Sequence, residues 1–468
     1  MSEVLPFPPG SGVSDGGATL SSQFIRRYNR PAPRYTSYPT TPHFHEGVDR
    51  AAYAAWLDEV EPGATLSIYL HIPYCDSLCW FCGCHTKVVR RYDPVAAYLD
   101  VLTREMDLVA ERLEVPHRIT NLHWGGGSPT ILSPKDMRRL VARIHQDFHL
   151  DPNAEFAVEI DPRDLGDDKI RALSDIGVNR VSIGVQDVHP EVQRAINRLQ
   201  PFDVTKGAVD RLRAVGLNTI NCDLMYGLPY QSEARVLESV EKVLTLDPDR
   251  IAIFGYAHVP RLKRQQRLIP EDSLPDGEQR LAQALAASHR LQEAGYRRIG
   301  LDHFARPGDS LAMAAKSGRL HRNFQGYTPD EADALLGLGA SAIGKLPQGY
   351  VQNEVPVRQY AAAVAEGRLP TVRGITLNDD DGLRGAIIER IMCDFAVDLG
   401  ALCAAKGVSP SNFGPELDRL AALECDGLVK RSGFRVRVTE AGRPFLRYVA
   451  SVFDRYLETQ DGRHTQSL

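Results

Sequence analysis

The chain has 468 residues, of which 43% are hydrophobic and 25% are charged, as in an ordinary globular protein. This composition excludes a collagenous, disordered or disulfide-scaffold protein, and the length allows roughly three domains. The 55 Lys and Arg residues against 60 Asp and Glu residues give a net charge of −5, which argues against general nucleic-acid binding. The chain has no apolar run of about 18 residues and no secretory signal, so we expect a cytoplasmic protein without membrane insertion.

The chain begins with two distinct segments. Residues 1–22 are rich in Gly, Ser and Pro and predict a disordered start. Residues 23–60 form an N-terminal arm, in which the stretch 27–39 holds three prolines and three tyrosines. A flexible tail has no need of these aromatic rings, so we expect an ordered arm that packs against another part of the protein.

Residues 61–375 alternate between strand-like and helix-like patterns. Six strand–helix repeats predict right-handed βαβ units around a parallel sheet, and a seventh, weaker strand is expected at 296–304. Six strands are too few for a closed eight-stranded barrel, so the expected fold class is α/β with an incomplete (β/α)6, TIM-like barrel. A doubly wound open sheet has the same alternation of strands and helices, so periodicity alone leaves this alternative open. The expected strands are 66–73, 119–126, 155–161, 180–186, 219–227 and 250–258.

Residues 376–468 follow a different pattern. Leu383, Ile387, Ile391 and Phe395 recur every four residues and predict an amphipathic helix. A second helix near 415–426, a hairpin over 427–439 and a last helix complete a mainly helical, winged-helix-like domain. Such modules often bind DNA, but this one carries 12 basic and 14 acidic residues, a net charge of −2. The charge favours a structural cap over a DNA-reading domain.

Four of the eight cysteines gather in one short segment. Cys75, Cys79, Cys82 and Cys84 lie within ten residues, whereas the other four are scattered and are expected to be buried hydrophobic side chains. A structural zinc site normally needs a second cysteine or histidine pair, and a redox dithiol does not explain Cys75. The spacing Cys-x3-Cys-x2-Cys suits three corners of a [4Fe–4S] cluster whose fourth iron is open to a small chelating molecule.

This spacing after the first predicted barrel strand resembles the radical S-adenosylmethionine (SAM) superfamily, in which the open iron chelates SAM. A glycine run, Gly125-Gly126-Gly127, follows the second predicted strand and resembles the segment of that superfamily that lets the backbone approach SAM. Glycine suits this place because it has no Cβ. A glycine run alone is weak evidence, since a tight turn also uses it.

Further motifs along residues 24–457 resemble the oxygen-independent coproporphyrinogen III oxidase family. Cys84 and the Pro-Arg-Tyr-Thr arm distinguish this family from the related haem chaperones, which resemble only the core. Cys84 is not required as a ligand, and its role stays open. The matching motifs are 33–39, 82–84, 123–127, 221–229, 302–307 and 321–327.

The resemblance implies a [4Fe–4S] cluster on Cys75, Cys79 and Cys82 and two bound SAM molecules. Most of the implied SAM-binding residues fall at or just beyond predicted strand ends, where a barrel places its chemistry. Ser128 stands where the family usually has threonine, so the hydroxyl is kept. For the first SAM molecule the matching residues are Tyr69, Gly126, Glu159 and Ile343, and for the second they are Phe81, Gly127, Ser128, Gln186, Arg198, Asp223 and Ala257.

The implied reaction is oxidative decarboxylation of two propionate side chains of coproporphyrinogen III to vinyl groups, which gives protoporphyrinogen IX. A 5′-deoxyadenosyl radical from SAM takes a hydrogen from each propionate, and an electron donor protein reduces the cluster. The substrate carries four carboxylates, for which Arg34, Arg306 and Arg322 are candidate partners. A monomer is expected from the resemblance. The alternative functions are a haem chaperone and, less favoured by charge, a cluster-bearing DNA regulator.

Overall fold

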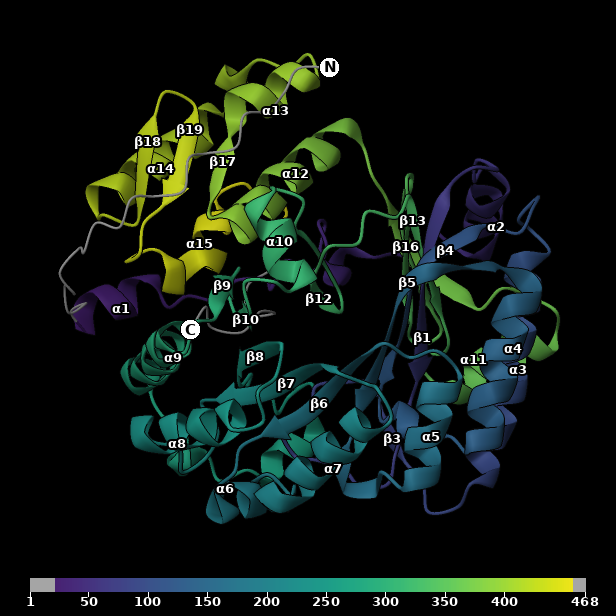
Figure 1. Ribbon diagram of the computed structural model, residues 1–468. Coiled ribbons are helices and arrows are strands. Elements are labelled where there is room, and N and C mark those ends of the chain that lie inside the picture. Colours follow the sequence, from purple (N-terminus) through teal and green to yellow (C-terminus); the bar gives the residue numbers. More distant parts are fainter. Residues whose placement is uncertain (1–21, 458–468) are drawn as a thin grey trace. The chain divides into compact units, whose positions relative to one another are not determined.

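The computed structural model describes residues 22–457 of the chain (Figure 1). The disordered start expected at 1–22 therefore lies outside the described residues, apart from its last position. No helix among the described residues is both long and apolar enough to cross a membrane. The chain forms two compact units: a barrel unit, Thr41–Leu274 with Asp330–Asn378, and a C-terminal unit, which takes the residues up to Thr40, Pro275–Pro329 and the residues from Asp379 onward. The division into consecutive domain ranges, which the sequence analysis expects, stays a prediction.

The barrel unit is built on an open sheet with a parallel centre. Its strands run in the order β16-β15-β14-β13-β1-β4-β5-β6-β7-β8, and every neighbouring pair from β13 to β8 is parallel. The order does not close on itself, so the prediction of an incomplete (β/α)6 barrel is confirmed. The central strands are β1 (Thr65–Ile72), β4 (Arg118–Gly126), β5 (His149–Ile160), β6 (Arg180–Gln186), β7 (Thr219–Tyr226) and β8 (Arg250–Gly255).

Four further strands, which the sequence pattern does not predict, extend this sheet beyond β1. Their runs are short and contain several glycines, so no clear alternation of polar and apolar residues marks them. They are β13 (Ala334–Leu338), β14 (Ile343–Leu346), β15 (Gly349–Asn353) and β16 (Thr371–Thr376). Two short strands, β2 (Tyr74–Cys75) and β3 (Lys87–Val88), pair beside the first cysteine.

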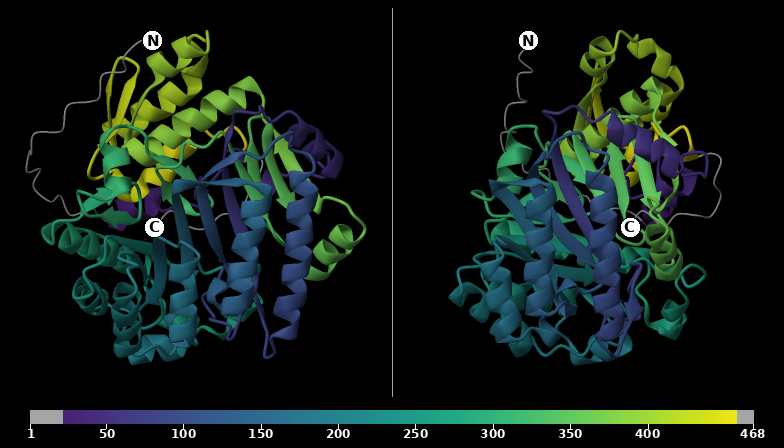
Figure 2. Two further views of the ribbon diagram at one scale, coloured as in Figure 1. Left: turned by 45° about the vertical axis from the view of Figure 1, so that its right-hand side comes forward. Right: turned by 90° about the vertical axis from the view of Figure 1, so that its right-hand side faces the viewer.

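Helices connect the parallel strands, and α3, α4 and α5 lie side by side along the sheet (Figures 1 and 2). Helix α4 shows why these segments fold as they do. Ser133 caps it by accepting a hydrogen bond from the Asp136 amide at 3.2 Å, Pro134 opens it, and Met137, Leu140 and Ile144 bury one face. The helices are α2 (Arg50–Asp58), α3 (Asp93–Ala110), α4 (Pro134–Asp147), α5 (Asp167–Asp175), α6 (Pro190–Ala195), α7 (Phe202–Ala214), α8 (Glu233–Leu244) and α11 (Val357–Ala365), with 3-10 turns η1 (Thr41–His43), η2 (Pro129–Ile131), η3 (Pro162–Asp164), η4 (Arg264–Leu268) and η5 (Glu271–Ser273).

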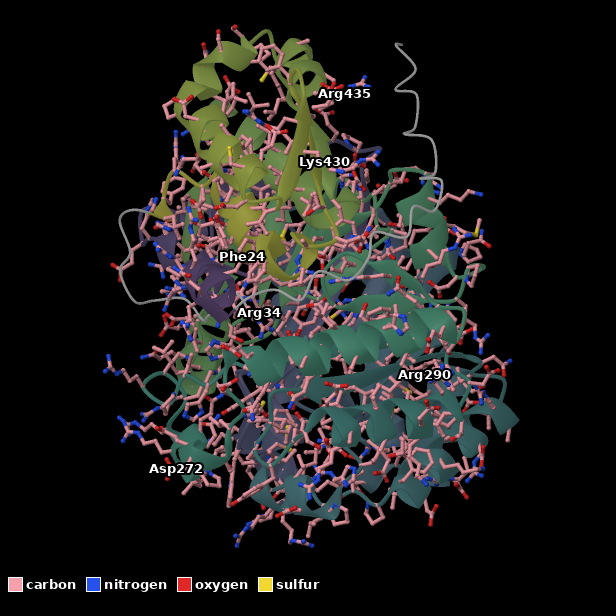
Figure 3. All side chains as sticks on the ribbon, turned by 90° about the vertical axis from the view of Figure 1, so that its left-hand side faces the viewer. Phe24, Arg34, Asp272, Arg290, Lys430 and Arg435 are labelled. Atoms are coloured by element: carbon pink, nitrogen blue, oxygen red, sulfur yellow. The ribbon has the colours of Figure 1, made fainter. Side chains whose placement is uncertain are left out.

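The C-terminal unit contains the predicted winged-helix-like module. A three-stranded antiparallel sheet in the order β17-β19-β18 accompanies helices α12, α13 and α14. Arg435 of the hairpin, labelled with Lys430 in Figure 3, pairs with Asp398 at 2.7 Å, so part of the hairpin's positive charge is neutralised within the module. The module consists of α12 (Asp379–Asp394), β17 (Ala396–Asp398), α13 (Leu399–Ala405), η6 (Pro410–Phe413), α14 (Gly414–Cys425), β18 (Val429–Ser432), β19 (Arg435–Val438), η7 (Arg443–Phe445) and α15 (Leu446–Ser451).

The N-terminal arm packs into the core of this unit, as expected from its aromatic residues. Tyr35 and Tyr38 are each 5% exposed and share a hydrophobic cluster with Ile387 of α12 and Val449 of α15. The Tyr35 hydroxyl donates to Asp454 at 3.0 Å. The other elements are α1 (Ser22–Tyr28), α9 (Gly277–Glu293), β9 (Arg297–Ile299), β10 (His303–Ala305), α10 (Ser310–Lys316), β11 (His321–Asn323) and β12 (Gly326–Thr328).

Two local expectations were wrong. The weak seventh strand expected at 296–304 is the antiparallel pair β9–β10, because Gly300, at a φ of +54°, turns the chain between them. Of the scattered cysteines, Cys222, Cys393 and Cys403 are buried as expected, but Cys425 is exposed at the end of α14.

Candidate active site around the three-cysteine loop

The loop that carries Cys75, Cys79 and Cys82 begins just after the carboxyl end of β1. Backbone hydrogen bonds hold it at its start and in its middle, since the Val89 amide donates to the Cys75 carbonyl at 3.1 Å and the Trp80 amide donates to the Ile196 carbonyl at 2.9 Å. Parallel strands present their carboxyl ends at one edge of a sheet, where barrel enzymes place their chemistry. The loop therefore lies at the catalytic end of the barrel unit.

Cys79 is 8% exposed and has two arginines at its sulfur. Arg198 donates to Sγ at 3.5 Å and Arg163 donates to it at 3.7 Å. Both arginines also hold Asp161, at 3.1 Å and 2.6 Å. Burial alone raises the pKa of Asp161, but the hydrogen bond from Arg163 and the charges of both arginines bring it below its usual value. Two guanidinium groups thus donate to the Cys79 sulfur and share the Asp161 carboxylate.

The other two thiols differ in their surroundings. Burial raises the pKa of Cys75 to about 12, although the Thr86 hydroxyl lies 3.0 Å from its sulfur. A hydrogen bond from the Cys84 thiol lowers the pKa of Cys82 to about 7 against the effect of burial. Cys84 therefore interacts with a proposed ligand.

The donor set fits an iron–sulfur cluster. Three thiols on one loop match three corners of a [4Fe–4S] cluster, and each corner needs its own iron. In residues 22–457, no group of three His, Cys, Asp or Glu side chains is arranged to hold one metal ion. The arginines at Cys79 supply the N–H donors to sulfur that tune such clusters.

The glycine run at the carboxyl end of β4 brings backbone close to the loop. Gly126 adopts a φ of +109°, and a Cβ there would lie 2.5 Å from the His71 ring. A Cβ on Gly127 would lie 2.4 Å from the Tyr74 carbonyl oxygen, while the Gly127 amide donates to the Ile72 carbonyl at 2.8 Å. Gly126 requires glycine because of its positive φ and the nearby His71 ring, and Gly127 because a Cβ would press on the Tyr74 backbone next to Cys75.

Three of the four residues expected at the first SAM molecule lie together. Glu159 accepts from the Gly126 amide at 3.1 Å and contacts His123 Nε2 at 3.3 Å. The Tyr69 ring lies 5.7 Å from the His123 ring, centroid to centroid. Burial raises the pKa of Glu159, but the hydrogen bond and charge of His123 and the Gly126 amide lower it overall, so the carboxylate stays ionised. Ile343 begins β14, and its carbonyl packs against Gly337, the residue of β13 that pairs with Tyr69.

Five of the seven residues expected at the second SAM molecule form two groups. At the ends of β6 and β7, Arg198 donates to the Gly184 carbonyl at 2.8 Å, and Gly184 pairs with Asp223 across the strands. Gln186 follows at a φ of +66°. In the other group, Gln266 joins Phe81 and Ala257 by donating to both carbonyl oxygens at 3.1 Å.

The remaining two second-site residues follow β4. The Ser128 amide donates to the Tyr74 carbonyl at 2.7 Å, next to Gly127, and the Ser128 side chain is buried. Its hydroxyl lies 3.4 Å from that of Thr130. The Ser128 hydroxyl is therefore held near the glycine run.

A buried carboxylate on helix α3 binds the turn that follows β13. Glu105 of α3 is 1% exposed and accepts from the Gly339 amide at 2.7 Å, Asn353 at 2.6 Å and Tyr360 at 2.6 Å. Its helix neighbour Tyr98 donates to the His71 carbonyl at 2.8 Å. Helix α3 therefore fixes the turn after β13 to the carboxyl end of β1, from which the cysteine loop departs.

Glu105 also predicts a pH dependence of stability. Burial raises the pKa of Glu105 from 4.5 to about 7 despite three hydrogen bonds. As the pH rises above 4.5 the unfolded chain releases this proton first, so the free energy of unfolding falls by about 3 kcal/mol up to pH 7. We expect Glu105→Gln to lack this fall when urea unfolding is measured at pH 5 and pH 7. Glu114→Gln, an exposed control, should keep it, and an unchanged pH dependence in Glu105→Gln would contradict the assignment.

Two of the three candidate substrate arginines lie together in the C-terminal unit. Arg322 Nε donates to the Arg34 carbonyl at 3.3 Å, and its Nη1 is buried without a hydrogen-bond partner among the described residues. Burial raises the pKa of Asp302, but His303 and the charges of Arg322 and Arg34 bring it down to about 2. Arg306 instead lies over the Tyr296 ring at 5.2 Å. Arg34, labelled in Figure 3, and Arg322 thus form the stronger pair of candidates.

Sequence reasoning missed several residues of this site. Asp161 had a usable signal, because it follows Glu159 by two positions at the end of a predicted strand. Arg163 gave no signal beyond lying near a predicted strand end. His123 lies in the matching motif 123–127 but was not assigned a role. Gln266 and Glu105 could not be found, because their partners are far away in the sequence.

An open parallel barrel whose first strand leads into a Cys-x3-Cys-x2-Cys loop is the architecture of a radical SAM enzyme. The radical SAM superfamily accordingly matches residues 69–243. An oxygen-independent coproporphyrinogen III oxidase of Bradyrhizobium diazoefficiens is 50% identical over 436 residues, which cover 93% of this chain and 97% of that protein. A protein of the same name from Pseudomonas aeruginosa is 38% identical and covers 93% of this chain and 96% of its own length.

A solved structure agrees with these relatives. The coproporphyrinogen III oxidase of Escherichia coli, described as a radical SAM enzyme, superposes with a TM-score of 0.87 at 38% identity and covers 91% of this chain and 98% of its own. The chain belongs to the oxygen-independent coproporphyrinogen III oxidase family. It is an oxidoreductase of the radical SAM class, and its family implies a [4Fe–4S] cluster and SAM as cofactors.

Proposed function

We propose that this chain converts coproporphyrinogen III to protoporphyrinogen IX by oxidative decarboxylation of two propionate side chains. The observation that carries the proposal is the three-thiol loop beside a glycine run and an ionised Glu159, in a chain 50% identical to an enzyme named for this substrate. Each propionate would lose one hydrogen atom, CO2 and one electron and become a vinyl group. We further propose that the chain acts as a monomer in the cytoplasm and that an electron donor protein reduces its cluster.

Cys75, Cys79 and Cys82 would hold the cluster. When bound, the cluster supplies the electron that cleaves SAM and so produces the radical that takes a hydrogen from the propionate. Arg198 and Arg163 would donate hydrogen bonds to the Cys79 sulfur, which they contact at 3.5 Å and 3.7 Å.

The SAM-binding residues would act as two sets around the strand ends. Glu159, Gly126, Tyr69 and Ile343 would orient the first SAM molecule, with the Glu159 carboxylate suited to a ribose hydroxyl or the sulfonium region. Arg198, Gln186, Asp223, Ser128, Gly127, Phe81 and Ala257 would hold the second. Arg34 and Arg322 would bind substrate carboxylates, with Arg306 as a weaker candidate.

Glu159→Gln should weaken SAM binding. The substitution replaces the charged acceptor of the Gly126 amide, and a hydrogen bond to a charged group contributes about 1.5–3 kcal/mol. We expect an increase of about 10- to 100-fold in the Kd for SAM, measured by anaerobic equilibrium dialysis of the reconstituted protein. Exposed Glu233→Gln is the matched control, and equal affinity in the two variants would remove Glu159 from the site.

A paired assay separates the enzyme from a haem chaperone. Reconstituted protein is reduced under anaerobic conditions with SAM and coproporphyrinogen III, and porphyrins are resolved by chromatography after oxidation. In parallel, haem is titrated into the same preparation. Decarboxylated porphyrin is expected, and stoichiometric haem binding without decarboxylated product would overturn the proposal.

A further inference from the structure

A basic segment lies directly on the cysteine loop in the barrel unit. Lys263 donates to the Cys84 carbonyl at 3.1 Å, and Gln265 donates to the Cys82 carbonyl at 2.7 Å. Gln266 reaches the Phe81 carbonyl at 3.1 Å. One short segment therefore makes three hydrogen bonds to the backbone of the loop that would carry the cluster.

The same segment exposes positive charge and apolar surface. Arg261, Arg264 and Arg267 are exposed, and none of them has an ion-pair partner within residues 22–457. Leu262 is 72% exposed and Leu268 is 58% exposed, so both leucines present apolar surface to solvent. Leucines with these exposures beside unpaired arginines are typical of an interaction surface.

The charge of this segment contrasts with that of the whole chain. Residues 261–268 contain four basic residues and no acidic residue, whereas the chain has a net charge of −5. Acidic residues resume at Glu271, which contacts His258, and at Asp272, labelled in Figure 3. A local positive patch on an acidic protein steers an acidic partner to one place and repels it elsewhere.

We propose that the exposed face of residues 261–268 is the docking surface for a small acidic one-electron carrier protein. This rests on the proposed function, which needs one electron per SAM molecule. The carrier is oxidised by one electron, which the protein receives at the cysteine loop, and no bond is made or broken in that transfer. The arginines guide the carrier and the two leucines contact the surface around its redox group, while Lys263, Gln265 and Gln266 join the patch to the loop.

The test uses a flavodoxin as the acidic carrier and a triple variant, Arg261→Glu, Arg264→Glu and Arg267→Glu. Binding of oxidised flavodoxin to the reconstituted holoenzyme is measured by calorimetry at low and high salt. Formation of 5′-deoxyadenosine is then measured with reduced flavodoxin and, separately, with dithionite. The control variant, Arg50→Glu, Arg171→Glu and Arg358→Glu, makes the same charge change at exposed positions of the barrel unit.

We expect the triple variant to bind flavodoxin at least about tenfold more weakly and to lose activity with flavodoxin by a similar factor. Its activity with dithionite should equal that of the wild type, and the control variant should behave as the wild type throughout. Unchanged flavodoxin binding in the triple variant would overturn the docking surface. The docking surface would also be overturned if the triple variant lost binding to anionic lipid vesicles but still bound flavodoxin.

The two proposals fail differently. If the wild type forms no 5′-deoxyadenosine even with dithionite, the proposed function fails, and the flavodoxin isotherm still decides the docking surface. Leu262→Asn provides a second variant without a charge change. It should weaken flavodoxin binding without altering its salt dependence, because it removes apolar contact alone.

Discussion

Cys79→Ala is expected to abolish cluster binding. Cys79 is the most buried of the three loop thiols proposed as ligands, and its removal also leaves Arg198 and Arg163 without their shared sulfur acceptor. We expect the iron content of the reconstituted protein to fall from about four to below one per chain. Formation of 5′-deoxyadenosine should fall by more than about 100-fold, since even indirect supports of a metal site contribute 10- to 100-fold.

Cys425→Ala is the matched control for this variant. Cys425 is exposed at the end of α14 and far from the loop in sequence. Its iron content and visible absorption should equal those of the wild type. If Cys79→Ala retained a full complement of iron, the three-cysteine assignment would be wrong.

Gly127→Ala is expected to disable the site without removing a ligand. The new Cβ would lie 2.4 Å from the Tyr74 carbonyl oxygen and 2.8 Å from its nitrogen, both backbone atoms that cannot rotate away. The glycine run or the segment leading into Cys75 must therefore shift. A displacement of about 1 Å at an active site can cost about 100-fold in rate, and we expect a loss of that size in 5′-deoxyadenosine formation.

Gly83→Ala provides a control within the cysteine loop itself. A Cβ at Gly83 meets no atom within 4 Å. This variant should keep its iron and its activity within about twofold of the wild type. If Gly127→Ala and Gly83→Ala behaved alike, the close approach of the glycine run to the loop would have no functional role.

The central fold could be predicted because its signals are local. Each of the six parallel strands is an apolar run, and each connecting helix shows its own periodicity, so β6 at Arg180–Gln186 was predicted to the residue. The strands β13 to β16 were missed because short, glycine-containing strands such as β14 carry no such pattern. Gly337 packs against the Ile343 carbonyl, a contact that depends on tertiary structure alone.

The site was predictable only where a motif was contiguous or a known family supplied it. The three cysteines and the glycine run are each compact in sequence, and spacing alone drew attention to them. Asp161 could have been added from its position after Glu159. The residues that hold the loop in place could not be predicted. Gln265 contacts Cys82 across more than 180 positions of the sequence, and Glu105 contacts Gly339 across more than 230.

The most direct measurement counts SAM cleavage against product in one anaerobic reaction. Reconstituted and reduced protein is supplied with SAM, coproporphyrinogen III and an electron acceptor, and both 5′-deoxyadenosine and protoporphyrin are quantified by chromatography. We expect about two 5′-deoxyadenosine molecules per protoporphyrin, one for each propionate. A protein that binds its cluster and SAM but forms no decarboxylated porphyrin would contradict the proposed function.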